Sequence, residues 1–364
     1  MLSEQVLSAT LNNVQVTLTK ASDIPPSSIS WVWDGWLAQG KFHVLAGVPE
    51  AGKTQIALDV ASRISRGDTM PDGSEGLAGS AIIWSGEDDP NDTLVPRLIR
   101  SGAALDRVRI ITGTNKGPFD PSRDMGSLLL DSDLLDDLRL LILDPVISAV
   151  TGDSNQANQV RRALQPIVDF AAKTKCAVLG ISHLTKGTSG RDPLERITGS
   201  GAFGAVPRVV WFASKGAEQR ILCRVKSNIS ESGGGLHYSV VPKAIRSGVL
   251  VSGVEWGQRL VGSAVELIGG NEFSDPDLAA AKELLIERLS LGAVSSKDID
   301  QEAKDLGIGR STLNRAKKAL KVTSKKSGFK GGWVLCLHEE AEEFEESNTA
   351  SSVSSQSSED RHDI

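Results

Sequence analysis

The chain has 364 residues, of which 40% are hydrophobic and 24% charged, the balance of a soluble globular protein with room for one large domain and a small one. No apolar run reaches about 18 residues and no basic-then-apolar leader is present, which argues against a membrane-spanning or secreted protein. Three widely spaced cysteines within apolar runs predict reduced core thiols and a cytoplasmic protein.

Charge is unevenly distributed along the chain. The formal net charge is -6, but residues 339–364 hold nine acidic residues and one arginine, so the remaining residues carry a net +2. The stretch 310–330 contains eight basic residues and no acidic one. A basic segment followed by an acidic one predicts a nucleic-acid partner and a separate acidic tail.

In chain order, the first predicted elements are a short apolar strand over 42–46, a glycine-rich loop and a helix over 54–65. Further apolar runs of strand length follow at 81–84, 108–112, 138–144, 176–183 and 208–213. Segments with helical spacing lie at 94–103 and 159–175, and two antiparallel edge strands are expected at 220–228 and 235–242. Buried strands that alternate with helices predict an α/β fold with a mainly parallel sheet and helices on both faces.

Composition divides the rest of the chain. Residues 1–30 form a mixed, polar N-terminal extension, and the α/β domain is expected over 31–265. The pattern breaks around "GGNEFSDPD", which predicts a linker over 266–275. Three helical segments and a β-type segment predict a small compact domain over 276–338, and residues 339–364, acidic and serine-rich, are expected to be disordered.

Residues 47–54, "GVPEAGKT", match the phosphate-binding loop G-x-x-x-x-G-K-[ST] in full, between a strand and a helix as such a loop requires. Loop N–H groups would face the phosphates of ATP, Lys53 would contact the β and γ phosphates, and the Thr54 hydroxyl would bind Mg²⁺. Glu50 is either a sensor or a side chain that points away from the loop. The predicted nucleotide-binding residues are Gly47, Val48, Pro49, Glu50, Ala51, Gly52, Lys53, Thr54 and Gln55.

Three polar residues follow later strands. Asp144 ends the apolar run 138–144, where it could hold Mg²⁺ as in a Walker B strand or merely cap the strand. Glu87 lies just past the run 81–84, at the sheet edge where ligands bind, and could deprotonate an attacking water. The alternatives for that role are Asp88 and Asp89. His183 ends the run 176–183 and is either a γ-phosphate contact or a structural histidine.

A family resemblance rests on an ordered set of motifs over residues 22–245: "WVWDGWLAQGKFHVLAGVPEAGKT", "SGEDDP", "LLILDP", "ISHLTK", "GSGAFGAVPRVVWF" and "VKSN". The set resembles the RepA-type, RecA-fold P-loop ATPases, which include hexameric replicative helicases of plasmids and related ATPases of phages and mobile elements. The resemblance implies a RecA-like core, ATP bound between neighbouring subunits, Glu87 as catalytic base and His183 as sensor.

The resemblance also implies a cationic finger supplied by the next protomer. Arg208 is the first candidate and Lys226 the second, with surface cations as the alternative for both. Related helicases often read K-x-R at the second motif, where this chain has Lys226 and Asn228. In the resembling family the loop after the sensor strand contacts single-stranded DNA, so Lys186, Arg191 and Arg196 are candidates for phosphate contacts, unless the loop is only solvated.

Residues 296–307 and 309–320 have helix-turn-helix spacing, and 323–337 could form a wing hairpin, as in the winged-helix units appended to many mobile-element ATPases. The second helix could lie in a major groove of duplex DNA; the alternative is a protein-docking module. Its candidate DNA contacts are Arg310, Asn314, Arg315, Lys317 and Lys318.

Two functions from different classes remain. The first is a ring-forming, hexameric motor that hydrolyses Mg-ATP and acts on single-stranded DNA in plasmid, phage or mobile-element replication. Replication proteins are possible partners, and no membrane association is expected. The second is an ATP-switched DNA-binding regulator or adaptor with slow hydrolysis. A recombinase-like filament is a third hypothesis. The acidic tail could occupy the basic helix, or serve as a solubilising segment or a tether for a partner.

Overall fold

The computed structural model describes residues 17–130, 135–154, 156–185, 192–197, 201–215, 219–246, 248–272, 276–290, 292–326 and 332–337. The chain divides into two compact units, Met1–Ser30 and Trp31–Ile364. The described part of the first unit contains one short 3-10 turn, Ala21–Asp23.

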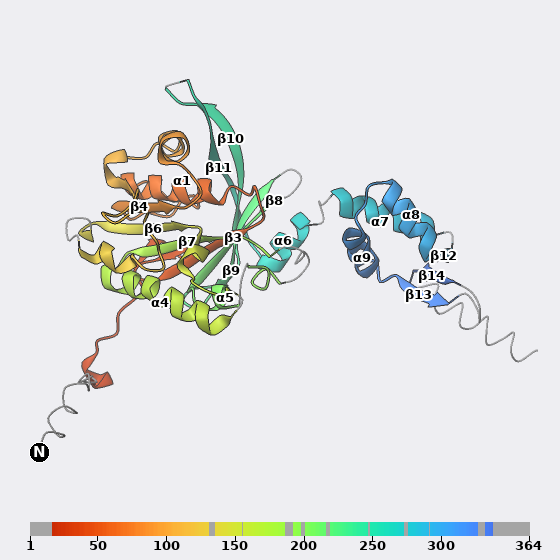
Figure 1. Ribbon diagram of the computed structural model, residues 1–364, viewed down its shortest axis with the longest axis horizontal. Helices are drawn as coiled ribbons and strands as arrows, with labels where there is room; N and C mark the ends of the chain where they lie inside the picture. Colours follow the sequence, from red (N-terminus) through yellow and green to blue (C-terminus); the bar gives the residue numbers. More distant parts are fainter. Residues whose placement is uncertain are drawn as a thin grey trace, which may run out of the picture. The chain divides into compact units, whose positions relative to one another are not determined.

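A nine-stranded sheet forms the centre of the second unit, in the order β11-β10-β9-β8-β3-β7-β6-β4-β5 (Figure 1). The strands are β3 (Phe42–Gly47), β4 (Ser80–Ser85), β5 (Val108–Ile110), β6 (Leu138–Asp144), β7 (Ala177–Ser182), β8 (Val209–Lys215), β9 (Arg220–Ser227), β10 (Gly235–Ala244) and β11 (Leu250–Leu260). The strands from β8 to β5 run parallel, and β9, β10 and β11 continue the sheet antiparallel. The predicted α/β fold with a mainly parallel sheet is confirmed.

Helices cover both faces of this sheet, as expected for parallel strands that are buried on both sides. Figure 1 shows α1 (Lys53–Arg66) on one face and α4 (Ala157–Thr174) on the other. Each face has its own apolar cluster, one that includes Ile56 and Val60 of α1 and one that includes Leu164 and Phe170 of α4. The other helices of this region are α2 (Val95–Arg100), α5 (Ala202–Ala205) and α6 (Ala264–Glu272).

A small hairpin of β1 (Trp31–Trp33) and β2 (Leu37–Ala38) adds tryptophans to the α1 face. The ring of Trp33 stacks on Trp36 at 4.7 Å and meets Trp211 of β8 edge-on at 5.4 Å. Short 3-10 or π turns occupy Pro90–Leu94, Leu105–Arg107, Met125–Leu130 and Val146–Ala149.

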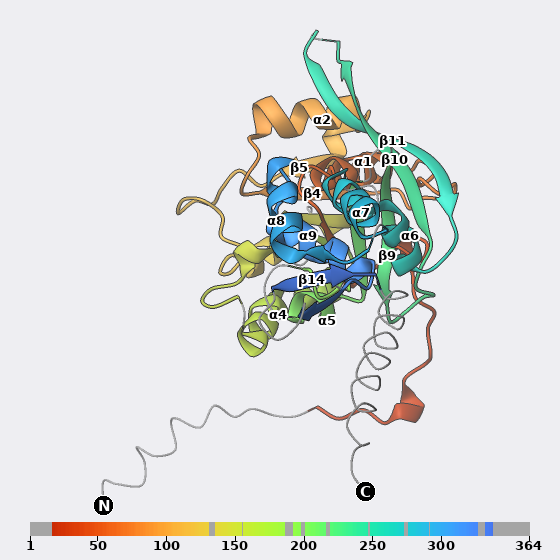
Figure 2. The same cartoon turned by 90° about the vertical axis from the view of Figure 1, so that its right-hand side faces the viewer.

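Two features differ from the sequence-based expectations. Strand β11 was not predicted; it pairs with β10 along most of its length, and the tip of this hairpin projects beyond the sheet (Figures 1 and 2). The predicted linker over 266–275 is wrong at its start, because α6 extends to Glu272. Its Ile268 is buried against Phe212 and Cys223, and this packing outweighs the helix-breaking tendency of the glycines.

The last described elements share a separate apolar cluster that includes Leu285, Ile299 and Leu313. They are α7 (Pro276–Leu289), β12 (Val294–Ser295), α8 (Ser296–Asp305), α9 (Arg310–Ala319), β13 (Thr323–Lys326) and β14 (Trp333–Cys336). The three strands form an antiparallel sheet in the order β12-β14-β13. The element types agree with the predicted three helices and β-type segment.

The three cysteines are buried and unpaired. Among the described residues, none of the helices combines the length and the apolar character needed to cross a membrane.

Candidate active site

The glycine-rich loop joins the end of β3 to the start of α1, and neighbouring strands fix its path. Gly47 is required for space, because a Cβ atom there would overlap the carbonyl oxygen of Ala213 on β8. Gly52 has a φ of +85°, and a Cβ there would lie 2.9 Å from Val240 of β10. The Val48 N–H donates to the Ala213 carbonyl at 3.1 Å. Both glycines of the motif therefore serve close packing as well as chain reversal.

Strand β10 supports the loop through Tyr238, which was not among the predicted site residues. The buried hydroxyl of Tyr238 donates to the carbonyl oxygen of Ala51 at 2.6 Å. Tyr238 is 3% exposed, and burial raises the pKa of its phenol. No local pattern indicates this contact, because 187 residues separate the two partners in the chain.

Lys53, the first residue of α1, is folded back into the loop. Its Nζ donates to the carbonyls of Gly47 at 3.2 Å and Val48 at 3.1 Å. The residue is 6% exposed, and burial lowers the pKa of the ammonium, an effect that Asp144 and Glu87 oppose. The loop thus holds one positive charge at the position where a phosphate-binding lysine is expected.

Thr54 and Asp144 lie together, although they belong to different elements. The Thr54 Oγ1 donates to Asp144 Oδ2 at 2.7 Å. Asp144 ends β6 and is 3% exposed; burial raises the pKa of its carboxyl to about 6, and the Thr54 hydrogen bond opposes this. The two predicted Mg²⁺ ligands are thereby brought to one point.

Hydroxyl and carboxylate oxygens are the hard donors that Mg²⁺ prefers, and a single carboxylate is sufficient when phosphate and water supply the other ligands. Within the described ranges, no three acidic, histidine or cysteine side chains group as a site made of protein ligands alone. The pair of Thr54 and Asp144 therefore fits Mg²⁺ that is bound together with a nucleotide.

Glu87 and His183 meet beside this pair. β7 separates β3 from β6, and β4 lies on the other side of β6, so the ends of these strands meet at one edge of the sheet. The Gly86 N–H donates to the carbonyl of Asp144 at 2.8 Å, which ties the turn after β4 to the end of β6. The Nε2 of His183 lies 3.5 Å from Oε1 of Glu87, and both side chains are about half exposed, at 46% and 54%. A carboxylate in this position can accept a proton from water.

The two alternatives to Glu87 are engaged in local structure. Asp88 forms an ion pair with Arg97 at 2.6 Å. Asp89 caps the Pro90–Leu94 turn by accepting from the N–H groups of Asn91 and Asp92. Of the three acidic residues, Glu87 is the one whose side chain pairs with another predicted site residue, His183.

Glu50 points away from the loop. Its side chain is 79% exposed and pairs with Lys215, at the end of β8, at 2.8 Å. The hydrogen bond from Lys215 lowers the pKa of the carboxyl. This agrees with the second interpretation of Glu50, in which its side chain has no part in nucleotide binding. Of the other predicted loop residues, Pro49 is exposed and Val48 and Gln55 are half-buried.

Arg208 and Lys226 lie at the opposite edge of the sheet from the loop. The Arg208 N–H donates to the carbonyl of Phe42, at the start of β3, so the length of that strand, about 17 Å, separates Arg208 from the loop. Lys226 pairs with Val210 on the adjacent strand. Neither cation can reach the loop of its own chain.

The two cations differ in their surroundings. The Nζ of Lys226 donates to the carbonyls of Gly204 and Ala205, each at 2.8 Å, and of Pro207 at 2.9 Å. Burial lowers the pKa of this ammonium, and Arg208 adds to the effect. Arg208 is exposed. Lys226 thus stabilises the end of α5, whereas the guanidinium of Arg208 faces solvent.

The predicted DNA contacts of the core are placed only in part. Lys186 and Arg191 lie outside the described residues. Arg196 is 4% exposed, and its guanidinium lies over the ring of Phe212 at 5.1 Å. A buried guanidinium does not reach a DNA phosphate, so the predicted contact of Arg196 with DNA is wrong.

Part of the predicted DNA-contacting face of helix α9 is exposed to solvent. Arg310, Asn314 and Lys318 are exposed, and Arg315 is half-buried. Lys317 is held by Asp300 of α8 at 2.9 Å, with 17% of its side chain exposed. Leu313 and Ala316 are buried in the apolar cluster, as the spacing predicts.

Comparisons with known proteins give one family match and one similar solved structure. A family model described as "AAA domain" matches residues 8–189, half of the chain. Among solved structures, "Crystal structure of the RadB recombinase" is similar to this chain at 17% identity and a TM-score of 0.41, covering 56% of this chain and 89% of that one. The comparison with curated proteins gave no match.

Proposed function

This chain belongs to the AAA domain family and has a RecA-fold P-loop core, and from that premise we propose that it is a Mg-dependent ATPase that works as a ring-forming, hexameric motor on DNA. The proposed setting is plasmid, phage or mobile-element replication in the cytoplasm, with replication proteins as partners. The observation that carries the ATPase is the 2.7 Å hydrogen bond between Thr54 and Asp144, beside Lys53.

Each site residue has a distinct task in this proposal. Lys53 would turn from the loop carbonyls to the phosphates, and Thr54 and Asp144 would hold the metal. Bound Mg²⁺ would supply positive charge against the phosphate oxygens. Glu87 would take a proton from the attacking water, and His183, at 3.5 Å, would position that carboxylate and respond to the γ-phosphate.

The positions of Arg208 and Lys226 support assembly of the chain into an oligomer. Because Arg208 lies at the opposite sheet edge from its own loop and is exposed, it would complete a site only on a neighbouring copy. Such a head-to-tail contact closes into a ring when its rotation allows. We assign Arg208, rather than Lys226, to this finger role.

The C-terminal elements support DNA binding. Their chain order of α7, β12, α8, α9, β13 and β14 agrees with a winged helix, in which α9 would enter the major groove. The exposed Arg310, Asn314 and Lys318 would contact base edges or phosphates.

One observation favours a second function, an ATP-switched regulator or adaptor with slow hydrolysis. The Lys226 ammonium is engaged with three backbone carbonyls, and Asn228 stands where related helicases often have arginine. A site with a single finger cation would hydrolyse ATP slowly and act through nucleotide occupancy.

Phosphate release with and without single-stranded DNA separates the two functions. The motor predicts hydrolysis that rises several-fold with DNA and is lost in Glu87→Gln. Negligible hydrolysis in both proteins, together with ATP binding, would instead support the switch.

A further inference from the structure

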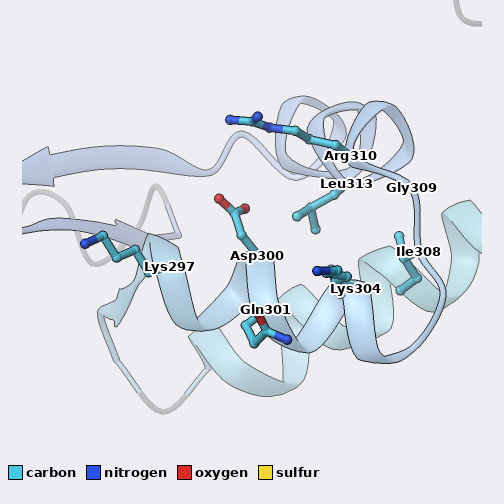
Figure 3. A pocket seen from close by; sticks show the side chains of 9 residues that line it. Lys297, Asp300, Gln301, Lys304, Ile308, Gly309, Arg310 and Leu313 are labelled. Atoms are coloured by element: carbon cyan, nitrogen blue, oxygen red, sulfur yellow. The ribbon is translucent and has the colours of Figure 1, made fainter.

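A pocket of about 540 Å³ opens between α8 and the start of α9 (Figure 3). Three of its lining residues are apolar and belong to the buried cluster of this region: Ala303, Ile308 and Leu313. The apolar floor is part of a packed core, so the pocket has fixed walls on that side.

The rim of the pocket is cationic. Lys297, Lys304 and Arg310 line it and are exposed (Figure 3). Among the residues that the structure describes, none of these three forms an ion pair. The one acidic side chain of the lining, Asp300, is already paired with Lys317 at 2.9 Å. The pocket therefore combines an apolar floor with unneutralised positive charge.

The chain itself contains a segment of matching chemistry. Residues 339–346, "EEAEEFEE", hold six glutamates and one phenylalanine, Phe344. We propose that this acidic segment docks in the pocket between α8 and α9 of the same chain, with glutamates at the cationic rim and Phe344 on the apolar floor.

The segment can reach the pocket. It begins three residues after the end of β14, and Leu337 packs against the apolar cluster that also forms the pocket floor. The seven residues 338–344 span up to about 25 Å when extended, which is comparable to the diameter of a compact unit of this size. A second copy of the chain is not needed to supply the occupant.

Docking has a consequence for the proposed DNA contact. Arg310 lines the pocket and is also one of the exposed residues of α9, so a docked glutamate and a DNA phosphate compete for it. This consequence rests on the proposed function, whereas the docking itself does not.

Zero-length carbodiimide cross-linking of the full chain, read by mass spectrometry, tests the docking without DNA. Amide bonds between glutamates of 339–346 and Lys297 or Lys304 are expected to exceed those to Lys318 on α9, or to Lys321 just after it, at least three-fold. The double variant Lys304→Gln, Arg310→Gln should lower the remaining cross-link at Lys297 at least three-fold. All of these side chains are exposed, so the substitutions leave the core intact.

The matched control is Lys318→Gln, Lys321→Gln, which removes the same charge outside the pocket and should leave the Lys297 cross-link unchanged. Three results would overturn the proposal: an equal loss of the Lys297 cross-link in both double variants, cross-links spread uniformly over exposed lysines, or no cross-link at all. So would cross-links that join ¹⁴N and ¹⁵N chains in a mixed sample, because the occupant would then be a second copy. Failure of DNA binding in a separate assay would leave this result untouched.

Discussion

At the scale of single residues, two cations of the same sheet edge have different surroundings. The three N–H groups of the Lys226 ammonium all donate to backbone carbonyls, whereas Arg208 is exposed just before β8. An ammonium with this many backbone partners holds local structure, and an exposed guanidinium is available to a neighbouring subunit of the proposed ring.

This difference predicts opposite phenotypes for two alanine variants. Lys226→Ala leaves three carbonyls without their donor and should lower the free energy of unfolding by about 1–3 kcal/mol. Arg208→Ala should change stability by less than about 0.5 kcal/mol, because it is a surface substitution. It should reduce ATP hydrolysis about 1,000-fold if it supplies the finger.

Urea unfolding and phosphate release on the same preparations check both variants. A loss of hydrolysis in Lys226→Ala at full stability, with normal turnover in Arg208→Ala, would reverse the assignment.

Local motifs made much of the site predictable. The loop 47–54 and Asp144 are encoded in short contiguous patterns, and the structure places Lys53, Thr54 and Asp144 together. The surroundings of Arg196, Lys226 and Tyr238 were not predictable in this way. Their partners lie 16 to 187 residues away, so burial and hydrogen bonding there depend on how distant strands pack.

At the scale of elements, β10 braces the nucleotide loop. Tyr238→Phe removes the donor to the Ala51 carbonyl and leaves that buried oxygen unsatisfied, at a cost of about 1–3 kcal/mol in stability. Because the carbonyl belongs to the loop, we also expect weaker binding of ATP, measured with a fluorescent ATP analogue.

Thr174→Val is the control for this variant. It removes a hydroxyl at the end of α4 that donates to the Phe170 carbonyl at 2.8 Å and accepts from the Cys176 N–H at 3.3 Å, far from the loop in the chain. Equal loss of ATP affinity in both variants would show that the effect comes from general destabilisation and not from the loop.

Strand β3 carries a buried histidine that makes stability depend on pH. The Ala38 N–H donates to His43 Nε2 at 3.0 Å, and Nδ1 lies 3.3 Å from the Val178 carbonyl, so the neutral ring fits the site. Burial lowers the pKa of His43 from 6.5 to about 4.

The unfolded chain therefore binds more protons than the folded one between pH 6.5 and 4. The stabilisation from His43 is complete above pH 6.5 and falls by about 3 kcal/mol as the pH drops to 4. In His43→Gln, which keeps an acceptor for Ala38, urea unfolding should lose this component of the pH dependence. Parallel pH curves for the two proteins would contradict the assignment.

Element prediction succeeded where the apolar pattern was strong and continuous. The strand 138–144 was predicted to the residue, because each of its positions except one is fully buried. The region 250–272 was not predicted, since β11 mixes glycines with polar residues and α6 contains a glycine pair. These elements depend on pairing with β10 and on the burial of Ile268.

At the scale of the whole molecule, each active site of the proposed ring is formed by residues of two neighbouring protomers. Glu87→Gln would disable the site of its own chain, and Arg208→Ala would disable the site of a neighbour. An equimolar mixture of these two inactive proteins should regain up to about a quarter of the wild-type rate, because one interface in four combines an intact Glu87 with an intact Arg208.

Phosphate release measured after mixing and reassembly checks this recovery. Recovery should vanish when Glu87→Gln is mixed with Asp144→Asn, since both changes then disable the same side of the interface. A mixture of Glu87→Gln and Arg208→Ala that stays inactive would contradict a site shared between subunits.

The central claim is that Glu87 activates the water that attacks bound Mg-ATP. Its most direct test measures ATP binding and single-turnover hydrolysis in wild type, in Glu87→Gln and in Asp89→Asn, a control whose amide can still cap the turn after β4. We predict that Glu87→Gln binds ATP within about two-fold of wild type and hydrolyses it at least about 100-fold more slowly, while Asp89→Asn retains both activities. Hydrolysis by Glu87→Gln at the wild-type rate would contradict the account.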